Sequence, residues 1–189
     1  MTHRPVRRFV FLDRDGTLVR DTGYVHRTQD YALLPGVETG LHRLQHAGYA
    51  LAIVTNQSGI GRGLFTQAAF EAFQRLLLDD LARMGVTIER TLVCPHAPDA
   101  GCTCRKPAPG LLWRARDELG ADLARSWMIG DGERDVVAAR SAGCAGAVFV
   151  GPATSAPYDT ATARDLDEAA TIILAGDAPE RAPSTANSV

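Results

Sequence analysis

The chain has 189 residues, a formal net charge of −2, and a composition that is 46% hydrophobic and 22% charged. These values are typical of a globular protein with a core of ordinary size, and the near-neutral charge argues against a general nucleic-acid binder. The apolar run FVFL is too short for a signal peptide, and no stretch offers the roughly 20 apolar residues that a membrane span needs. We expect a cytoplasmic monomer without nucleic-acid or membrane partners, in a compartment where thiols stay reduced.

Short apolar runs that end in polar residues alternate with helical patterns along the chain. Strands are expected at 8–12, 49–55, 91–94, 126–131 and 146–150. Helices are expected at 35–48, 66–84, 107–120, 133–142 and 165–175. Thr66 can cap the second of these helices, and apolar residues recur in it every three or four positions. The alternation predicts an α/β fold with a parallel sheet that carries helices on both faces.

The regular pattern weakens towards the C-terminus. We expect a single domain over residues 1–175. Residues 176–189 are rich in Pro, Ala and Ser and lack large apolar side chains. Such a composition cannot bury enough apolar surface to offset the entropy of ordering, so it predicts a disordered tail.

Acidic residues follow two of the expected strands, where sheets of this kind place their sites. In FLDRDGT, the turn at Gly16 can bring Asp13 and Asp15 to one pocket, and GDGERD adds Asp131 and Asp135. Clustered carboxylates favour Mg²⁺, which needs oxygen ligands and shares them readily with phosphate. The plainer alternative is a polar turn in which Asp caps a helix and Gly supplies backbone freedom. Nearby donors in VTNQSG and the cation of Lys106 favour a site for phosphoryl transfer instead.

Four segments, DRDGT, TNQSG, CRKP and GDGERD, resemble in order the motifs of the haloacid dehalogenase superfamily of aspartyl phosphatases. The resemblance implies a Rossmann-like three-layer sandwich and hydrolysis through an aspartyl-phosphate. It makes Asp13 the nucleophile and a Mg²⁺ ligand, and Asp15 the general acid–base, with its backbone carbonyl on the metal. The remaining implied roles are phosphoryl binding by Thr55 and Lys106, Mg²⁺ binding by Asp131, and orientation of the metal water or Lys106 by Asp135.

The stretch CPHAPDAGCTCRKP contains three of the four cysteines of the chain. Cys94 and His96 form one closely spaced pair of potential ligands, and Cys102 and Cys104 form another. Two such pairs suit tetrahedral zinc, and four protein ligands would make the site structural, in a zinc loop over residues 94–104. A disulfide and a coincidental group of thiols are the alternatives.

The same stretch closely resembles the zinc loop of the heptose-bisphosphate and histidinol-phosphate phosphatase branch, in which this loop caps the active site instead of a larger domain. Two further segments, DTGYVHRTQDYALLPGV and TNQSGIGRG, resemble the enzymes that remove the 7-phosphate of D-glycero-D-manno-heptose 1,7-bisphosphate. Arg105 could clamp a second phosphate, because Arg binds phosphate in a bidentate manner. Gly132 stands where these enzymes often carry a substrate-contacting lysine. The substrate-binding residues expected from this resemblance and its loops are Asp21, Thr22, Gly23, Tyr24, Asn56, Gln57, Ser58, Arg62 and Arg105.

Three other functions remain open at this point. Histidinol phosphate would use the same catalytic residues but needs a pocket for imidazole, and another small phosphate ester is also possible. A zinc-stabilised binding module without activity belongs to a different class. It has no use for four acidic residues that repel phosphate, and Mg²⁺-dependent release of phosphate would separate enzyme from binder.

Overall fold

A computed structural model of the protein describes residues 6–176. These residues form a six-stranded sheet in the order β3-β2-β1-β4-β5-β6, and every neighbouring pair is parallel. The strands are β1 (Phe9–Leu12), β2 (Ala50–Asn56), β3 (Ile88–Cys94), β4 (Trp127–Gly130), β5 (Gly146–Val150) and β6 (Ala161–Ala163). None of the helices in residues 6–176 combines the length and the apolar character needed to cross a bilayer.

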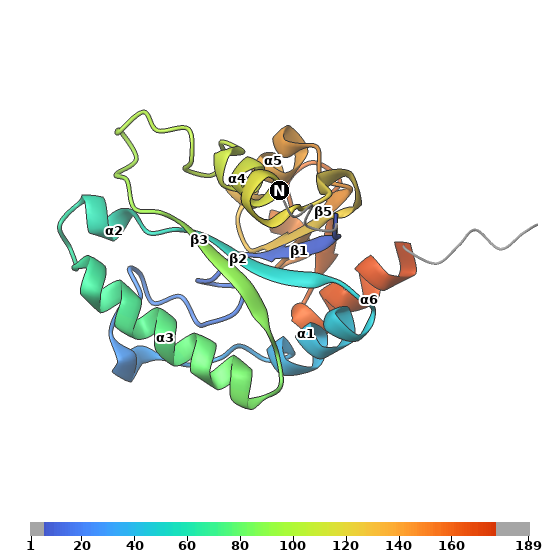
Figure 1. The fold of residues 1–189 in the computed structure, drawn as a ribbon, viewed down its shortest axis with the longest axis horizontal. Coiled ribbons are helices and arrows are strands. Elements are labelled where there is room, and N and C mark those ends of the chain that lie inside the picture. The colour runs from blue at the N-terminus through green and yellow to red at the C-terminus, as the bar shows by residue number, and fades with distance from the viewer. Residues whose placement is uncertain (1–5, 177–189) are drawn as a thin grey trace, which may run out of the picture.

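Helices cover both faces of the sheet (Figure 1), as its strands, apolar on both faces, require. The helices are α1 (Val37–His46), α2 (Ser58–Gly61), α3 (Gln67–Arg83), α4 (Gly110–Leu119), α5 (Glu133–Ala142) and α6 (Leu166–Gly176). Short 3₁₀ turns lie at Thr28–Asp30, Leu123–Arg125 and Ala153–Ser155. α1, α3 and α6 pack on one face, and α4 and α5 pack on the other. The predicted three-layer α/β sandwich is confirmed.

The alternation of side chains along β1 explains the two cores. Val10 and Leu12 join the cluster that α1, α3 and α6 cover, whereas Phe9 and Phe11 join the cluster under α4 and α5. All four side chains are fully buried. β1 is therefore fixed from both faces, and the loop that follows it starts from a rigid point.

The expected strands and helices are all present, with boundaries shifted by a few residues. β3 begins at Ile88, three residues earlier than expected, and the 107–120 helix begins at Gly110. The expected cap is found, since the side chain of Thr66 accepts a hydrogen bond from Ala69 N at 3.1 Å. β6 and α2 were not expected. β6 consists of three Ala and Thr residues, α2 is one glycine-rich turn, and neither has a periodic apolar pattern.

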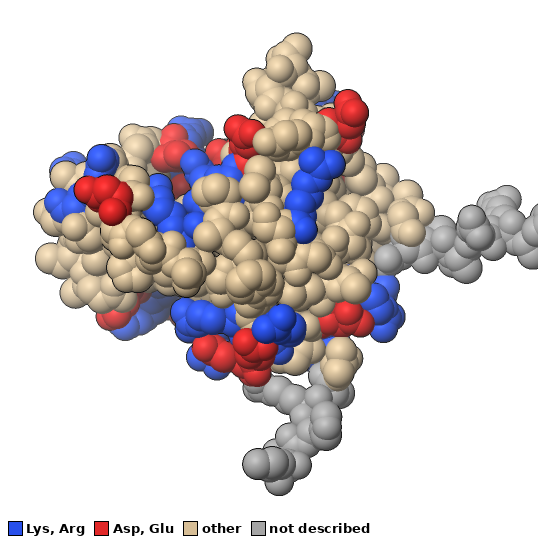
Figure 2. Space-filling model, turned by 90° about the horizontal axis from the view of Figure 1, so that it is seen from above, with Lys and Arg blue, Asp and Glu red and all other residues tan. Residues whose placement is uncertain are grey.

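The C-terminal boundary differs by one residue from the expected one. Gly176 closes α6, although it was assigned to the tail. The rest of the expected tail, residues 177–189, lies outside the described residues. On the face seen in Figure 2, basic and acidic side chains are interspersed rather than gathered into separate fields.

Candidate active site

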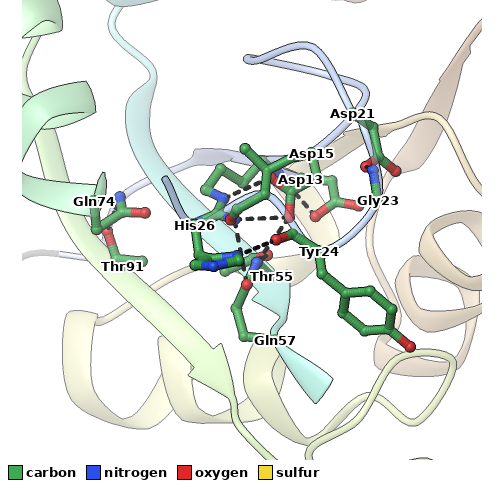
Figure 3. Close-up of polar contacts among 12 residues, drawn as sticks. Asp13, Asp15, Asp21, Gly23, Tyr24, His26, Thr55, Gln57, Gln74 and Thr91 are labelled. Atoms are coloured by element: carbon green, nitrogen blue, oxygen red, sulfur yellow. Dashed lines mark hydrogen bonds and ion pairs between the residues drawn. The ribbon is translucent and has the colours of Figure 1, made fainter. Parts of the chain in front are cut away.

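Three neighbouring strands end at the same edge of the sheet and carry the polar side chains of the site. β1 lies between β2 and β4, and Asp13, Asn56 and Asp131 stand at or just beyond the ends of these strands. In Figure 3 the side chains of Asp13, Asp15 and Gln57 gather at this edge. Residues far apart in sequence therefore meet where the strand order reverses, the usual position of a ligand site in such sheets.

A buried cation lies between two buried carboxylates. Lys106 Nζ is 2.9 Å from Asp13 Oδ1 and 2.6 Å from Asp135 Oδ1, and it donates a hydrogen bond to Val54 O at 2.6 Å. All three charged side chains are almost fully buried. Burial alone would lower the pKa of Lys106, but Asp13 and Asp135 raise it above the ordinary value, so the amine stays protonated. The two ion pairs fix the directions of the Asp13 and Asp135 carboxylates.

Asp131 and its neighbours fit a divalent cation. Oxygens of Asp13, Asp131 and Asp135 lie within 4.8 Å of one another. Asp131 Oδ1 is buried and has no hydrogen-bond partner among the described residues. Burial and the charges of Asp13 and Asp135 raise the pKa of Asp131 to about 6. Gly16 makes this approach possible, because a Cβ there would lie 2.0 Å from Asp131 Oδ2 and its φ of +81° also favours glycine.

Asp15 is held by Arg14, a residue that the sequence analysis did not select. Arg14 Nε and Nη2 donate to the two Asp15 oxygens at 2.8 and 2.9 Å, and Nη2 also donates to Val25 O at 2.7 Å. The guanidinium is fully buried and lies over the rings of Phe70 and Phe73. Burial raises the pKa of Asp15, and Arg14 opposes the shift. A signal was available in the sequence, since a charged residue between two strand-end carboxylates needs a partner wherever it is buried.

The TNQSG segment supports the site through amide groups. Gln57 Nε2 donates to Asp15 Oδ2 at 2.8 Å and to Thr55 Oγ1 at 2.9 Å. The Asn56 side chain exchanges two 3.0 Å hydrogen bonds with the backbone of Lys106. Asn56 and Gln57, expected to bind substrate, therefore also position Lys106, Thr55 and Asp15.

A cavity of about 260 Å³ opens beside these residues. The expected substrate-binding residues that line it are Asp21, Gly23, Tyr24, Asn56, Gln57, Ser58 and Arg105. Arg62 lines a neighbouring cavity and donates a hydrogen bond to the Tyr24 hydroxyl. Thr22 is exposed and is not among the residues that line either cavity. Arg134, which the sequence analysis did not select, lines the main cavity together with Arg105.

The four expected zinc ligands come together in the loop between β3 and α4. Cys94 Sγ lies 3.7 Å from Cys102 Sγ, and Cys104 Sγ lies 3.6 Å from Cys102 Sγ. His96 Nδ1 lies 3.6 Å from the Cys94 sulfur and 3.3 Å from the Cys104 sulfur. Tetrahedral ligands about 2.3 Å from zinc would be about 3.8 Å apart, close to this spacing. The sulfurs are too far apart for a disulfide, so the donor set fits a closed zinc site.

Comparisons with known proteins show the family to which the chain is similar. A family model described as HAD-hydrolase-like matches residues 103–175. The D-glycero-beta-D-manno-heptose-1,7-bisphosphate 7-phosphatase of Escherichia coli K12 is 43% identical over 148 residues, which cover 75% of this chain and 78% of that protein. The Photorhabdus laumondii protein of the same name is 41% identical over 172 residues, covering 87% and 88%.

Solved structures show the same relationship. The D,D-heptose 1,7-bisphosphate phosphatase from B. bronchiseptica, whose structure was solved with magnesium and phosphate, superimposes with a TM-score of 0.81 at 34% identity. The match covers 89% of this chain and 99% of that chain. The corresponding Burkholderia thailandensis enzyme matches with a TM-score of 0.66 at 28% identity, over 89% and 99% of the two chains. The chain therefore belongs to the haloacid dehalogenase-like phosphatases, in the branch that contains the heptose-bisphosphate phosphatases.

Proposed function

We propose that this protein removes the 7-phosphate of D-glycero-D-manno-heptose 1,7-bisphosphate in a Mg²⁺-dependent reaction. The observation that carries the proposal is the buried Asp13–Lys106 pair beside Asp131. Relatives 41–43% identical to this chain are named as phosphatases of this substrate, which supports the choice of sugar.

The proposed metal ligands are the carboxylates of Asp13 and Asp131 and the backbone carbonyl of Asp15. Two observations support a divalent cation there. Three carboxylates lie close together, and Asp131 Oδ1 is buried without a hydrogen-bond partner among the described residues. Bound Mg²⁺ would neutralise charge on the phosphoryl group, which otherwise repels an anionic nucleophile. Asp135 would remain on Lys106, as its 2.6 Å ion pair suggests.

Asp13 is the proposed nucleophile. One of its carboxylate oxygens attacks phosphorus, the bond from phosphorus to the sugar oxygen breaks, and Asp15 donates a proton to that oxygen. Water then attacks the aspartyl-phosphate, Asp15 takes a proton from the water, and phosphate leaves with Asp13 restored. Lys106 and the Thr55 hydroxyl hold the oxygens of the transferring group.

The environment of Asp15 suits both of its proposed steps. Burial raises its pKa, which favours the protonated acid, while Arg14 limits the shift so that the carboxylate can also serve as a base. Both Asp15 oxygens accept a hydrogen bond from Arg14, so the carboxyl group keeps one orientation in the two steps.

Arg105 and the cavity residues are proposed to select the substrate. Asp21 to Tyr24 and Ser58 would contact the sugar, and Arg105 would bind the phosphate that is not cleaved. Histidinol phosphate has no second phosphate and leaves that cation without a partner. Structural zinc is proposed at the Cys₃His cluster. Its cysteines form no disulfide and must stay reduced to bind zinc, which favours a reducing compartment such as the cytoplasm.

Steady-state kinetics test the proposal. The purified protein, supplied with Mg²⁺, is assayed with both anomers of the heptose bisphosphate, with histidinol phosphate and with p-nitrophenyl phosphate. We expect the highest kcat/KM for a heptose bisphosphate, and a higher value for histidinol phosphate would reject this substrate. Asp13→Asn should lose turnover of every ester while retaining the wild-type circular dichroism spectrum, and residual phosphatase activity in that variant would refute the nucleophile.

A further inference from the structure

Arg134 brings a cation to the cavity from the first turn of α5. Its Nη2 lies 3.7 Å from Asp13 Oδ2 and 3.7 Å from Asp131 Oδ1, and its side chain is 45% exposed. Both contacts are longer than direct hydrogen bonds. The guanidinium is therefore held near the carboxylates mainly by charge.

Gly132 leaves the space in which Arg134 folds back over the site. The backbone of Gly132 has φ −120° and ψ 149°, an extended conformation that any residue can adopt. Glycine is thus not required by the backbone. A Cβ at this position would lie 3.3 Å from both Cγ and Cζ of Arg134. The same Cβ would lie 3.2 Å from Asp135 Oδ2, so a larger side chain at residue 132 would displace both the Asp135 carboxylate and the Arg134 guanidinium.

Arg105 faces the same cavity from the turn before α4. Its Nη1 is buried and has no hydrogen-bond partner among residues 6–176. Two guanidinium groups line one cavity of about 260 Å³, and like charges in a small space repel each other unless an anion lies between them. The arrangement suits a ligand that carries phosphate.

We propose that Arg134 binds the phosphate undergoing transfer, by donating hydrogen bonds to its non-bridging oxygens from the Oδ2 side of Asp13. Lys106 holds the Oδ1 side, so the two cations contact different oxygens of the nucleophile. The inference rests on the proposed phosphatase function but not on the identity of the sugar. Arg134 also faces oxygens proposed to hold Mg²⁺, so the guanidinium and the divalent cation repel each other when no phosphate is bound.

Calorimetry of Arg134→Ala tests both the contact with phosphate and the repulsion between Arg134 and Mg²⁺. Inorganic phosphate and Mg²⁺ are the probes. At saturating Mg²⁺, we expect the Kd for phosphate to rise about tenfold, because a charge-assisted hydrogen bond is lost. Without phosphate, the Kd for Mg²⁺ should stay equal or fall, since a nearby cation is removed. A variant with a damaged site would instead bind both ions more weakly. Arg116→Ala, which removes an exposed arginine from α4, is the matched control and should change neither constant.

Two further variants keep the test decisive. Arg134→Lys should recover part of the phosphate affinity. Gly132→Val, which also crowds Asp135, should weaken phosphate binding more in the wild-type background than in Arg134→Ala. Unchanged phosphate affinity in Arg134→Ala, or weaker binding of both ions, would overturn the inference. Because these constants do not require turnover, they remain interpretable if the wild-type protein hydrolyses no ester, a result that would reject the proposed function alone.

Discussion

Each of the two buried cations at the carboxyl edge of the sheet is paired with one or two carboxylates. Lys106 is paired with Asp13 and Asp135, and Arg14 is paired with Asp15. Such pairs add little net stability over apolar side chains, but loss of one partner leaves an uncompensated buried charge. The pairs therefore fix the direction of catalytic groups at the cost of a site that tolerates few substitutions.

Arg14→Met should show how much stability is lost when one partner of such a pair is removed. The substitution removes the two hydrogen bonds that Arg14 donates to the Asp15 carboxylate, whose side chain is 18% exposed, and we expect a loss of about 3 kcal/mol in the free energy of unfolding. Urea denaturation measures the difference. Arg116→Met, at an exposed arginine paired with its neighbour Asp117, should leave the free energy of unfolding unchanged within error. Equal effects of the two variants would mean that the buried pair has no special role.

Asp131 makes the effect of Mg²⁺ dependent on pH. Its folded-state pKa of about 6 lies above the ordinary 3.8, so its contribution to stability is full below pH 3.8 and is lost as pH rises through 6. Bound Mg²⁺ needs the ionised carboxylate and relieves its repulsion with Asp13 and Asp135. The rise in Tm on adding Mg²⁺ should therefore be small at pH 5 and larger at pH 7, as differential scanning fluorimetry can measure. In Asp131→Asn, the rise in Tm on adding Mg²⁺ should not grow between pH 5 and pH 7. A rise of equal size at both pH values in the wild-type protein would contradict the assignment of Asp131 as a Mg²⁺ ligand.

The loop over residues 94–104, which carries the proposed zinc ligands, links the fold to the proposed catalytic residues. It joins the end of β3 at Cys94 to the turn that carries Arg105 and Lys106. The two hydrogen bonds between Asn56 and the Lys106 backbone fix the exit of the loop to β2. A bound ion would thus stabilise the entrance to the active site without touching substrate.

Removal of zinc should reduce stability first and activity as a consequence. Cys104→Ser takes away one of four ligands, and we expect a loss of about 2 kcal/mol or more, or roughly 4–8 °C in Tm. Metal analysis and thermal denaturation are the measurements. Cys144→Ser, which changes the cysteine outside the cluster, is the control and should retain zinc. A zinc-free protein with unchanged Tm and kinetics would refute a structural ion.

The elements differ in how far the sequence predicts them. β1 and α3 follow directly from an apolar run and from an apolar period with the Thr66 cap, because their own residues supply most of the signal. β6 depends on pairing with β5, and its Ala-Thr-Ala sequence has no preference strong enough to reveal it. The position of Arg134 beside Asp13 could not be predicted, because it depends on side chains that approach only after folding. Motif spacing found the carboxylates, the lysine and the thiols, and it gave Asp135 an orienting role but left out Arg14.

One apolar core lies on each face of the sheet, and α6, the last helix, completes one of them. Leu166, Ala169, Ala170 and Ile173 of α6 are buried in the cluster shared with α1. The site residues between Asp13 and Asp135 stand at the ends of the elements of this sandwich or in the loops that follow them. A single folding unit that ends with α6 is therefore the expected organisation.

Truncation can locate the end of this unit. A chain cut after Gly176 keeps all of α6, so we expect a Tm within about 2 °C of the full-length value and an unchanged kcat. A chain cut after Arg164 loses the burial of Leu166 and Ile173, at about 1.5–3 kcal/mol each, a large share of the 5–15 kcal/mol typical of a domain. That shorter chain should unfold or aggregate at 37 °C, as circular dichroism and size-exclusion chromatography would show. Marked destabilisation by the first cut would mean that residues 177–189 contribute to the fold, contrary to their expected disorder.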